Sequence, residues 1–142
     1  MLELDADAGG EGSSAGFILP RFNMCRDGFL AAATVSSLDR ATINECLRLA
    51  SEYVQIRSKI CVKSTVHLKL LDKLLDQFGS ESSQILTIDG VKAIFDEDSW
   101  VLVRPSNTED AIRISVESKA NNAQSLYKKI MEKVNLIYER VK

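Results

Sequence analysis

In the second half of the chain, hydrophobic and polar residues alternate in short runs that turn signals separate. Five runs predict β-strands: YVQIRSKICVK, SQILTI, VKAIF, WVLVR and AIRISVES. The turn signals at Asp89–Gly90 and at residues 96–99 make tight connections, so neighbouring strands are expected to be antiparallel. In the last run, Ile112, Ile114 and Val116 alternate with polar residues, which predicts a sheet with one dry face and one wet face.

Two segments instead carry apolar residues three and four positions apart, the spacing of an amphipathic helix. The first, STVHLKLLDKLLDQF, is expected to be capped by Ser64 or Thr65. The second follows the last strand and is expected to be capped by Asn121 or Asn122. Residues 53–142 are therefore predicted to form an α+β domain, an antiparallel sheet with two helices packed on one face.

Residues 1–52 have a different pattern, which predicts a loop, one strand and two helices. A glycine-rich loop at residues 9–16 leads into the short apolar run GFILP, and Asp27 can cap the helix that follows. One strand cannot bury two helices or satisfy its own backbone groups. We therefore expect residues 1–52 to be the C-terminal remnant of a larger α/β domain in a truncated chain.

The composition and charge distribution of the chain argue against some classes of binding partner. The 18 basic and 20 acidic residues are spread without long blocks, which argues against nucleic acid and against a membrane surface as partners. The start of the chain does not resemble a signal peptide, and no run of about 18 apolar residues occurs. Three widely spaced cysteines favour reduced, partly buried thiols, so a cytoplasmic location is expected.

The stretch VRPSNTED lies between two predicted strands and is the strongest candidate for chemistry. Pro105 ends the strand, so the following amides are expected to be free of the sheet. A phosphate group is well held by a guanidinium fork together with hydroxyls and free amides. Arg104, Ser106, Asn107 and Thr108 offer these groups, although the last three are also ordinary turn formers.

The glycine-rich segment GGEGSSAGF places Glu11 and Ser13 among small residues that allow a ligand to approach the backbone. A glutamate there can accept hydrogen bonds from two sugar hydroxyls. The alternative is a flexible linker. Elsewhere, His67 lies on an apolar helical stripe and is expected to be a packed residue, and the acidic run at residues 96–98 is expected to be a solvated turn.

With both loops in view, the chain resembles the C-terminal part of the α-D-phosphohexomutases, which include phosphomannomutase, phosphoglucomutase and phosphoglucosamine mutase. DGVKAIFDEDSWVLVRPSNTEDAIRISVE is similar to their fourth domain, which has a TBP-like fold and an R-P-S-[GN]-T-E phosphate loop. GGEGSSAGFILP, followed by CRDG, resembles the sugar-binding loop and the next helix of their third domain. The resemblance is dense at residues 9–28 and 89–117.

The resemblance implies a role for particular residues. The non-reacting phosphate of a phosphosugar would be held by Arg104, Ser106, Asn107 and Thr108. Glu11 and Ser13 would bind the hydroxyls of the sugar ring. Asp110 stands where the family usually has proline, and the alternation of the strand places Arg113 on the wet face as a solvated side chain.

The implied parent protein is an intramolecular phosphotransferase that interconverts hexose 1-phosphate and 6-phosphate. Its cofactors would be Mg²⁺ and a hexose 1,6-bisphosphate activator, and its missing N-terminal domains would be partners of this chain. The sequence contains neither a serine–histidine phosphoacceptor loop nor a D-G-D-G-D metal run. The resemblance therefore predicts no catalytic residue and no metal ligand here, and this chain alone is expected to be inactive.

Two alternatives stay open at this stage. The parent can be a phosphoglucosamine mutase, although SNT in place of SGT favours the mannose and glucose enzymes. The chain can also be a stand-alone module that binds phospho-ligands.

Overall fold

The computed structural model describes residues 6–11 and 16–142. The chain divides into two units between Arg48 and Leu49. The larger unit contains the candidate phosphate loop, and the smaller unit contains the glycine-rich segment.

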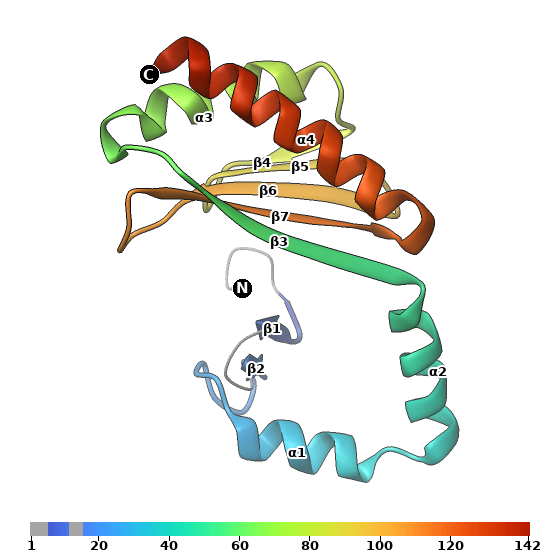
Figure 1. Ribbon diagram of the computed structural model, residues 1–142. Coiled ribbons are helices and arrows are strands. Elements are labelled where there is room, and N and C mark those ends of the chain that lie inside the picture. Colours follow the sequence, from blue (N-terminus) through green and yellow to red (C-terminus); the bar gives the residue numbers. More distant parts are fainter. Residues whose placement is uncertain (1–5, 12–15) are drawn as a thin grey trace. The chain divides into compact units, whose positions relative to one another are not determined.

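The larger unit is built on a five-stranded antiparallel sheet with the strand order β3-β7-β6-β5-β4. Its strands are β3 (Tyr53–Cys61), β4 (Gln84–Leu86), β5 (Val91–Asp96), β6 (Ser99–Pro105) and β7 (Ala111–Lys119). Helices α3 (His67–Gly79) and α4 (Ala120–Val141) lie on the same face of this sheet (Figure 1). The predicted α+β class, with two helices on one face of an antiparallel sheet, is confirmed.

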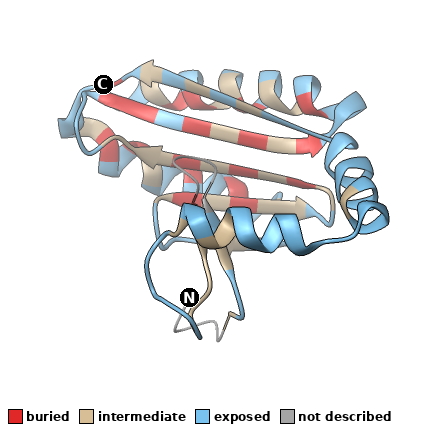
Figure 2. Cartoon of the chain, turned by 90° about the horizontal axis from the view of Figure 1, so that it is seen from below, coloured by how far each residue is buried: buried red, intermediate tan, exposed pale blue. Residues whose placement is uncertain are grey.

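The core lies between the sheet and these two helices, because every second residue of the central strands points towards α3 and α4. Figure 2 shows this alternation as buried residues along the strands. The buried core residues are Val62, Leu70, Leu74, Phe78, Val91, Ala93, Val101, Val103, Ile112, Ile114, Val116, Ile130, Val134 and Ile137. The opposite face, which we call the open face, carries polar side chains, including Lys59, Arg104 and Arg113.

Both helices begin differently from the prediction. A 3-10 turn, η2 (Ser64–Val66), precedes α3, and neither Ser64 nor Thr65 caps that helix with its side chain. Helix α4 begins at Ala120 directly after β7, also without a side-chain cap, so the predicted caps at Asn121 and Asn122 are wrong. In both places an amide near the helix start donates a hydrogen bond to an acceptor far away in sequence. The Ser64 amide donates to the Asp110 carboxylate, and the Ala120 amide donates to the Glu52 carbonyl.

The smaller unit begins with a two-stranded sheet, in which β1 (Gly9–Glu11) pairs with β2 (Gly16–Ile18). The sequence predicted a loop in place of β1. That prediction was wrong because the glycine backbone provides the same ladder groups as any other residue, and Gly10 pairs with Phe17. Asp27 caps the next helix as predicted, accepting a hydrogen bond from the Leu30 amide at 2.8 Å.

Helix α1 (Gly28–Ser37) and most of α2 (Arg40–Ser51) belong to this unit, and neither helix contains a buried residue. Phe29 is 91% exposed and Leu47 is 63% exposed. The apolar side chains of α1 project from all sides of the helix, which is typical of a helix that is enclosed by other elements. The described part of the chain therefore leaves the apolar surface of these helices uncovered. None of its helices is long and apolar enough to cross a membrane.

Candidate anion-binding site

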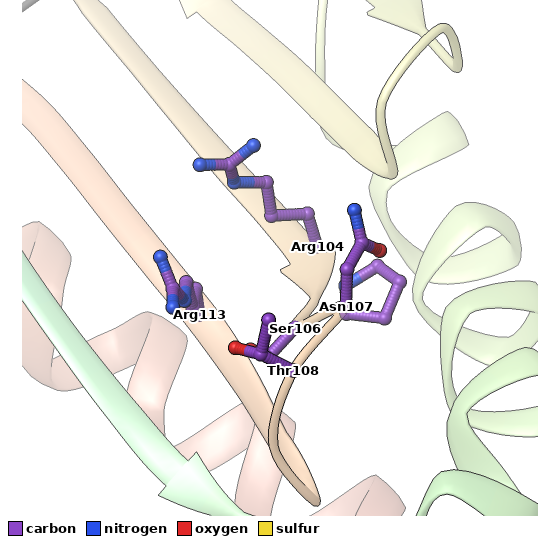
Figure 3. Close-up of a pocket in the computed structure, with 6 residues that line it drawn as sticks. Arg104, Ser106, Asn107, Thr108 and Arg113 are labelled. Atoms are coloured by element: carbon purple, nitrogen blue, oxygen red, sulfur yellow. The ribbon is translucent and has the colours of Figure 1, made fainter.

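The loop between β6 and β7 forms one wall of a surface pocket of about 180 Å³. The described residues that line the pocket are Arg104, Pro105, Ser106, Asn107, Thr108 and Arg113 (Figure 3). Two backbone hydrogen bonds close the loop: the Ser106 amide donates to the Ala111 carbonyl, and the Ala111 amide donates to the Glu109 carbonyl, both at 2.8 Å. The four candidate phosphate residues of the sequence are thus brought together in one pocket.

Two arginines lie side by side at this pocket, because Arg104 on β6 is the register partner of Arg113 on β7. Figure 3 shows both side chains rising from neighbouring strands next to the loop. Like charges directly opposite each other destabilise a sheet unless an anion offsets the repulsion. The sequence interpretation treated Arg113 as solvated; the signal that would have placed it here is the five-residue loop, which sets Arg113 opposite Arg104.

The hydroxyl of Ser106 lacks a hydrogen-bond partner. Its Oγ atom is buried, and nothing in the described residues bonds to it. A buried hydroxyl without a partner costs about 1–3 kcal/mol. An acceptor that entered the pocket would remove this cost.

The amides of Asn107 and Thr108 are also available. No hydrogen bond within residues 6–11 and 16–142 engages either nitrogen, and both residues are exposed. Consecutive free amides beside guanidinium groups form a concave site for anions. The pocket therefore combines two arginines, a partnerless hydroxyl and free backbone donors.

Carboxylates already pair with the cations around the pocket. Asp89 Oδ2 lies 2.6 Å from Arg104 Nη1. Glu109 bridges two basic residues: its Oε2 lies 2.6 Å from Lys59 Nζ, and its Oε1 lies 3.7 Å from Arg113 Nη2. The hydrogen bond from Lys59 lowers the pKa of Glu109 below its ordinary value, and the charge of Arg113 makes a smaller contribution in the same direction. An incoming anion must therefore compete with these carboxylates.

The backbone at Gly90 also shapes the site. Gly90 has a φ of 95°, and a Cβ atom there would lie 2.3 Å from the Val103 carbonyl oxygen and 2.7 Å from Arg104 Cβ. Only glycine tolerates both the left-handed backbone and this close approach. The turn between β4 and β5 is thereby held against the end of β6, where it presents Asp89 to Arg104.

Asp110 is not among the described residues that line the pocket, although it lies close in sequence to the loop residues that do. Its Oδ1 accepts a hydrogen bond from the Ser64 amide at 3.0 Å, and hydrogen bonding by Ser64 lowers the pKa of Asp110. The Val62 amide donates to the Asp110 carbonyl at 3.0 Å. The end of the loop is thus tied to the start of η2, and the Asp110 carboxylate is committed there.

The two predicted sugar-contact residues belong to the smaller unit. The backbone of Glu11 ends strand β1, and Ser13 lies outside the described residues. Their predicted role is neither supported nor contradicted by the geometry of the site.

The remaining candidates have structural roles. His67 is buried and its Nε2 lies 2.9 Å from the Val62 carbonyl oxygen, so it is packed as predicted. Asp98 is more than a solvated acid, because it pairs with Lys119 and Tyr53. The described residues contain no group of three His, Cys, Asp or Glu side chains that could hold a metal ion. The cysteines are free but exposed, not partly buried as predicted.

Comparison with known proteins places this chain in a family. The family model described as phosphoglucomutase/phosphomannomutase, C-terminal domain, matches residues 59–133. The model for the alpha/beta/alpha domain III of the same proteins matches residues 1–56.

Curated relatives agree with these matches. A probable phosphoglucosamine mutase of Methanothermobacter thermautotrophicus is 40% identical, and the match covers 100% of this chain and 30% of that protein. A probable phosphoglucosamine mutase of Methanobrevibacter smithii is 39% identical over 94% of this chain and 31% of its own length. The phosphoglucosamine/phosphogalactosamine mutase of Sulfurisphaera tokodaii is 34% identical over 84% of this chain and 28% of its own length.

A solved structure has the same fold. The crystal structure of a phosphoglucomutase/phosphomannomutase family protein from Burkholderia thailandensis aligns with a TM-score of 0.66 and 20% identity, over 96% of this chain and 29% of that one. The chain thus shares its fold with a phosphoglucomutase/phosphomannomutase family protein. The chain belongs to the phosphoglucomutase/phosphomannomutase family and spans about 30% of the length of its curated relatives.

Proposed function

We propose that the pocket binds the phosphate group of a phosphosugar and that the chain serves as the phosphate-binding part of a phosphohexomutase. The observation that carries this proposal is the buried Ser106 hydroxyl, which has no hydrogen-bond partner among the described residues and lies in a pocket lined by Arg104 and Arg113. Phosphate suits the pocket because its oxygens accept hydrogen bonds from guanidinium, hydroxyl and amide donors together.

In the proposed mode of binding, the residues of this chain hold and orient the substrate and take no part in bond breaking. The guanidinium groups of Arg104 and Arg113 bind phosphate oxygens, while the Ser106 hydroxyl and the backbone amides of Asn107 and Thr108 donate hydrogen bonds to them. Holding the unreactive phosphate fixes the position of the sugar and so lowers the entropic cost of reaction at its other end. In this proposal the nucleophile for phosphoryl transfer belongs to the other domains of the enzyme.

We propose two domains, a remnant of the third domain at residues 1–52 and a phosphate-binding domain at residues 53–142. In this proposal Glu11 and Ser13 contact the sugar hydroxyls. The exposed apolar side chains of α1 and α2, including Phe29 and Leu47, support the first assignment, because such helices need a sheet to cover. The remaining domains of the same enzyme are the proposed partners of this chain, in the cytoplasm.

Magnesium and a hexose 1,6-bisphosphate activator are proposed for the complete enzyme. The described residues offer no cluster of acidic side chains that fits a magnesium ion. We propose that the metal site lies in the other domains, and the isolated chain is expected to lack mutase activity.

The names of the relatives favour a phosphoglucosamine substrate over phosphomannose or phosphoglucose, because two of them are named as probable phosphoglucosamine mutases and a third as a phosphoglucosamine/phosphogalactosamine mutase. The SNT loop sequence had favoured the other two sugars. Assay of the full-length protein on glucosamine 1-phosphate, mannose 1-phosphate and glucose 1-phosphate decides among them. A stand-alone phospho-ligand-binding module is the alternative if the 142-residue chain binds phosphosugars tightly by itself.

Titration of the chain with inorganic phosphate and with glucosamine 6-phosphate, followed by proton–nitrogen NMR, tests the proposal. We expect the amide signals of Ser106, Asn107 and Thr108 to shift, and the shifts to be lost in Arg104→Ala. Arg57→Ala is the matched control, because Arg57 lies on the open face of β3 and donates to Gln55 instead of lining the pocket. Unchanged loop amides in the folded wild-type chain at millimolar ligand contradict the proposal.

A further inference from the structure

Three basic residues stand side by side on the open face. Lys59 on β3 is the register partner of Arg113 on β7, and Arg113 is the register partner of Arg104 on β6. Neighbouring strands are about 4.8 Å apart, so the three cations form a short row next to the phosphate loop. Two of them line the pocket, whereas Lys59 does not.

Glu109 lies between two of these cations, Lys59 and Arg113, and its carboxylate is closer to Lys59. Its Oε2 atom is 2.6 Å from Lys59 Nζ, which is hydrogen-bond distance, but its Oε1 atom is 3.7 Å from Arg113 Nη2, which is too long for a hydrogen bond. Lys59 is also the leading cause of the lowered pKa of Glu109, and the charge of Arg113 is the smallest. The carboxylate is thus held mainly by Lys59.

This arrangement matters because Glu109 is a potential competitor of the substrate. A carboxylate and a phosphate bind the same N–H edge of a guanidinium group through the same bidentate geometry. Without a second cation nearby, Arg113 would be the nearest partner for the Glu109 carboxylate. The arginine would then be occupied by a residue of its own loop, only four positions away in sequence.

We propose that Lys59 is a positioning residue for the phosphate site: it holds the Glu109 carboxylate away from Arg113, so that the guanidinium of Arg113 is free to bind the phosphate of the substrate. The proposal rests on the proposed function of the pocket. Lys59 acts here through Glu109 and does not touch the ligand. Its effect on binding therefore depends on the acid that it holds.

That dependence makes the proposal testable by a double-mutant cycle in the 142-residue chain, with inorganic phosphate as the probe. The four proteins are the wild type, Lys59→Met, Glu109→Gln and the double variant, and the dissociation constant is read from the NMR shifts of the loop amides. We expect Lys59→Met to weaken phosphate binding about fivefold, the upper range for an exposed ion pair. In the Glu109→Gln background the same change is expected to have almost no effect.

Two further variants separate positioning from simple charge. Lys59→Arg keeps a cation that can hold Glu109 and is expected to bind phosphate like the wild type. Lys92→Met removes a positive charge from β5, where Lys92 Nζ lies 4.4 Å from the centre of the Trp100 ring, and is expected to change binding little. Urea unfolding of each variant confirms that it is folded.

The outcomes distinguish this inference from the function on which it rests. Equal losses from Lys59→Met in both backgrounds, or an equal loss in Lys92→Met, overturn the positioning role and leave phosphate binding intact. No effect of Lys59→Met on wild-type affinity overturns it as well. If the folded wild-type chain does not bind phosphate at all, the proposed function itself is overturned, and the role of Lys59 with it.

Discussion

Arg104 and Asp89 form an ion pair at the mouth of the pocket, with Nη1 and Oδ2 2.6 Å apart. Asp89 belongs to the turn before β5, whereas Arg104 is near the end of β6. The arginine that the proposed phosphate needs is therefore occupied in the absence of ligand. A phosphate that binds Arg104 must first displace this carboxylate, so the pair sets the affinity of the site.

Removal of this competitor is expected to strengthen phosphate binding. Asp89→Asn should lower the dissociation constant by about two- to fivefold, the range for an exposed ion pair. Asparagine suits the turn because Asn-Gly is as favourable there as Asp-Gly. Phosphate titration followed by NMR measures the change, with Asp76→Asn as a control for the loss of one negative charge at a helix. Weaker binding in Asp89→Asn would instead show that Asp89 orients the guanidinium for the ligand.

The Ser106 hydroxyl is expected to help binding and to harm stability. Ser106→Ala should raise the free energy of unfolding by about 1 kcal/mol, because it removes a buried hydroxyl without a partner. The same change should weaken phosphate binding about tenfold, since a hydrogen bond to a charged group is lost. Urea unfolding and phosphate titration measure the two effects, with Ser115→Ala on the open face of β7 as the control. A less stable variant with normal binding would assign the hydroxyl a purely structural role.

Gly90 is expected to tolerate no side chain. Gly90→Ala should lower the free energy of unfolding by about 2–3 kcal/mol, because the left-handed backbone and the contact with the Val103 carbonyl both become unfavourable. Gly79→Ala is the matched control, since its added Cβ meets nothing within 4 Å. Urea unfolding compares the two variants. Equal stability of both would mean that the turn moves away from β6 without cost.

Glu81 is expected to make stability depend on pH. Hydrogen bonds from Lys133, and then from Lys129, lower its pKa in the folded protein below the ordinary value of 4.5, even though burial opposes them. The unfolded chain therefore binds the proton more readily, and this contribution to stability is present above about pH 4.5 and is lost as the pH falls through the folded-state pKa.

Urea unfolding at several pH values measures this dependence. Between pH 6 and pH 3, about the range that spans both protonation states, the stability of Glu81→Gln should fall less than that of the wild type. Parallel curves for the wild type and Glu81→Gln would show that the ion pairs do not affect folding.

The sheet of the larger unit was predictable because its strands alternate buried and exposed residues, as at Ile112 and Arg113. The loop residues of the pocket were predictable as well, because they are contiguous in sequence. The helix starts were not, since the amides of Ser64 and Ala120 bond to acceptors far away in sequence. A local capping rule has no access to such partners.

The neighbours of the basic residues around the loop also depend on contacts between segments that are distant in sequence. Arg113 lies nine positions after Arg104, and the pairing of β6 with β7 across the five-residue loop sets them opposite each other. Lys59 is fifty positions from Glu109 and reaches it through the pairing of β3 with β7. Residue types were visible in the sequence, but their neighbours across the strands depended on the register.

The hydrogen bond between the Asp110 carboxylate and the Ser64 amide has a practical consequence. The amide proton of Ser64 lies outside the pocket, yet its solvent exchange depends on the placement of the loop end. Ligand that reorders the loop should change the exchange rate at Ser64, whereas ligand that only shields the pocket should not. The exchange rate of the Ser64 amide therefore reports on the conformation of the loop from outside the pocket, and no label has to be attached.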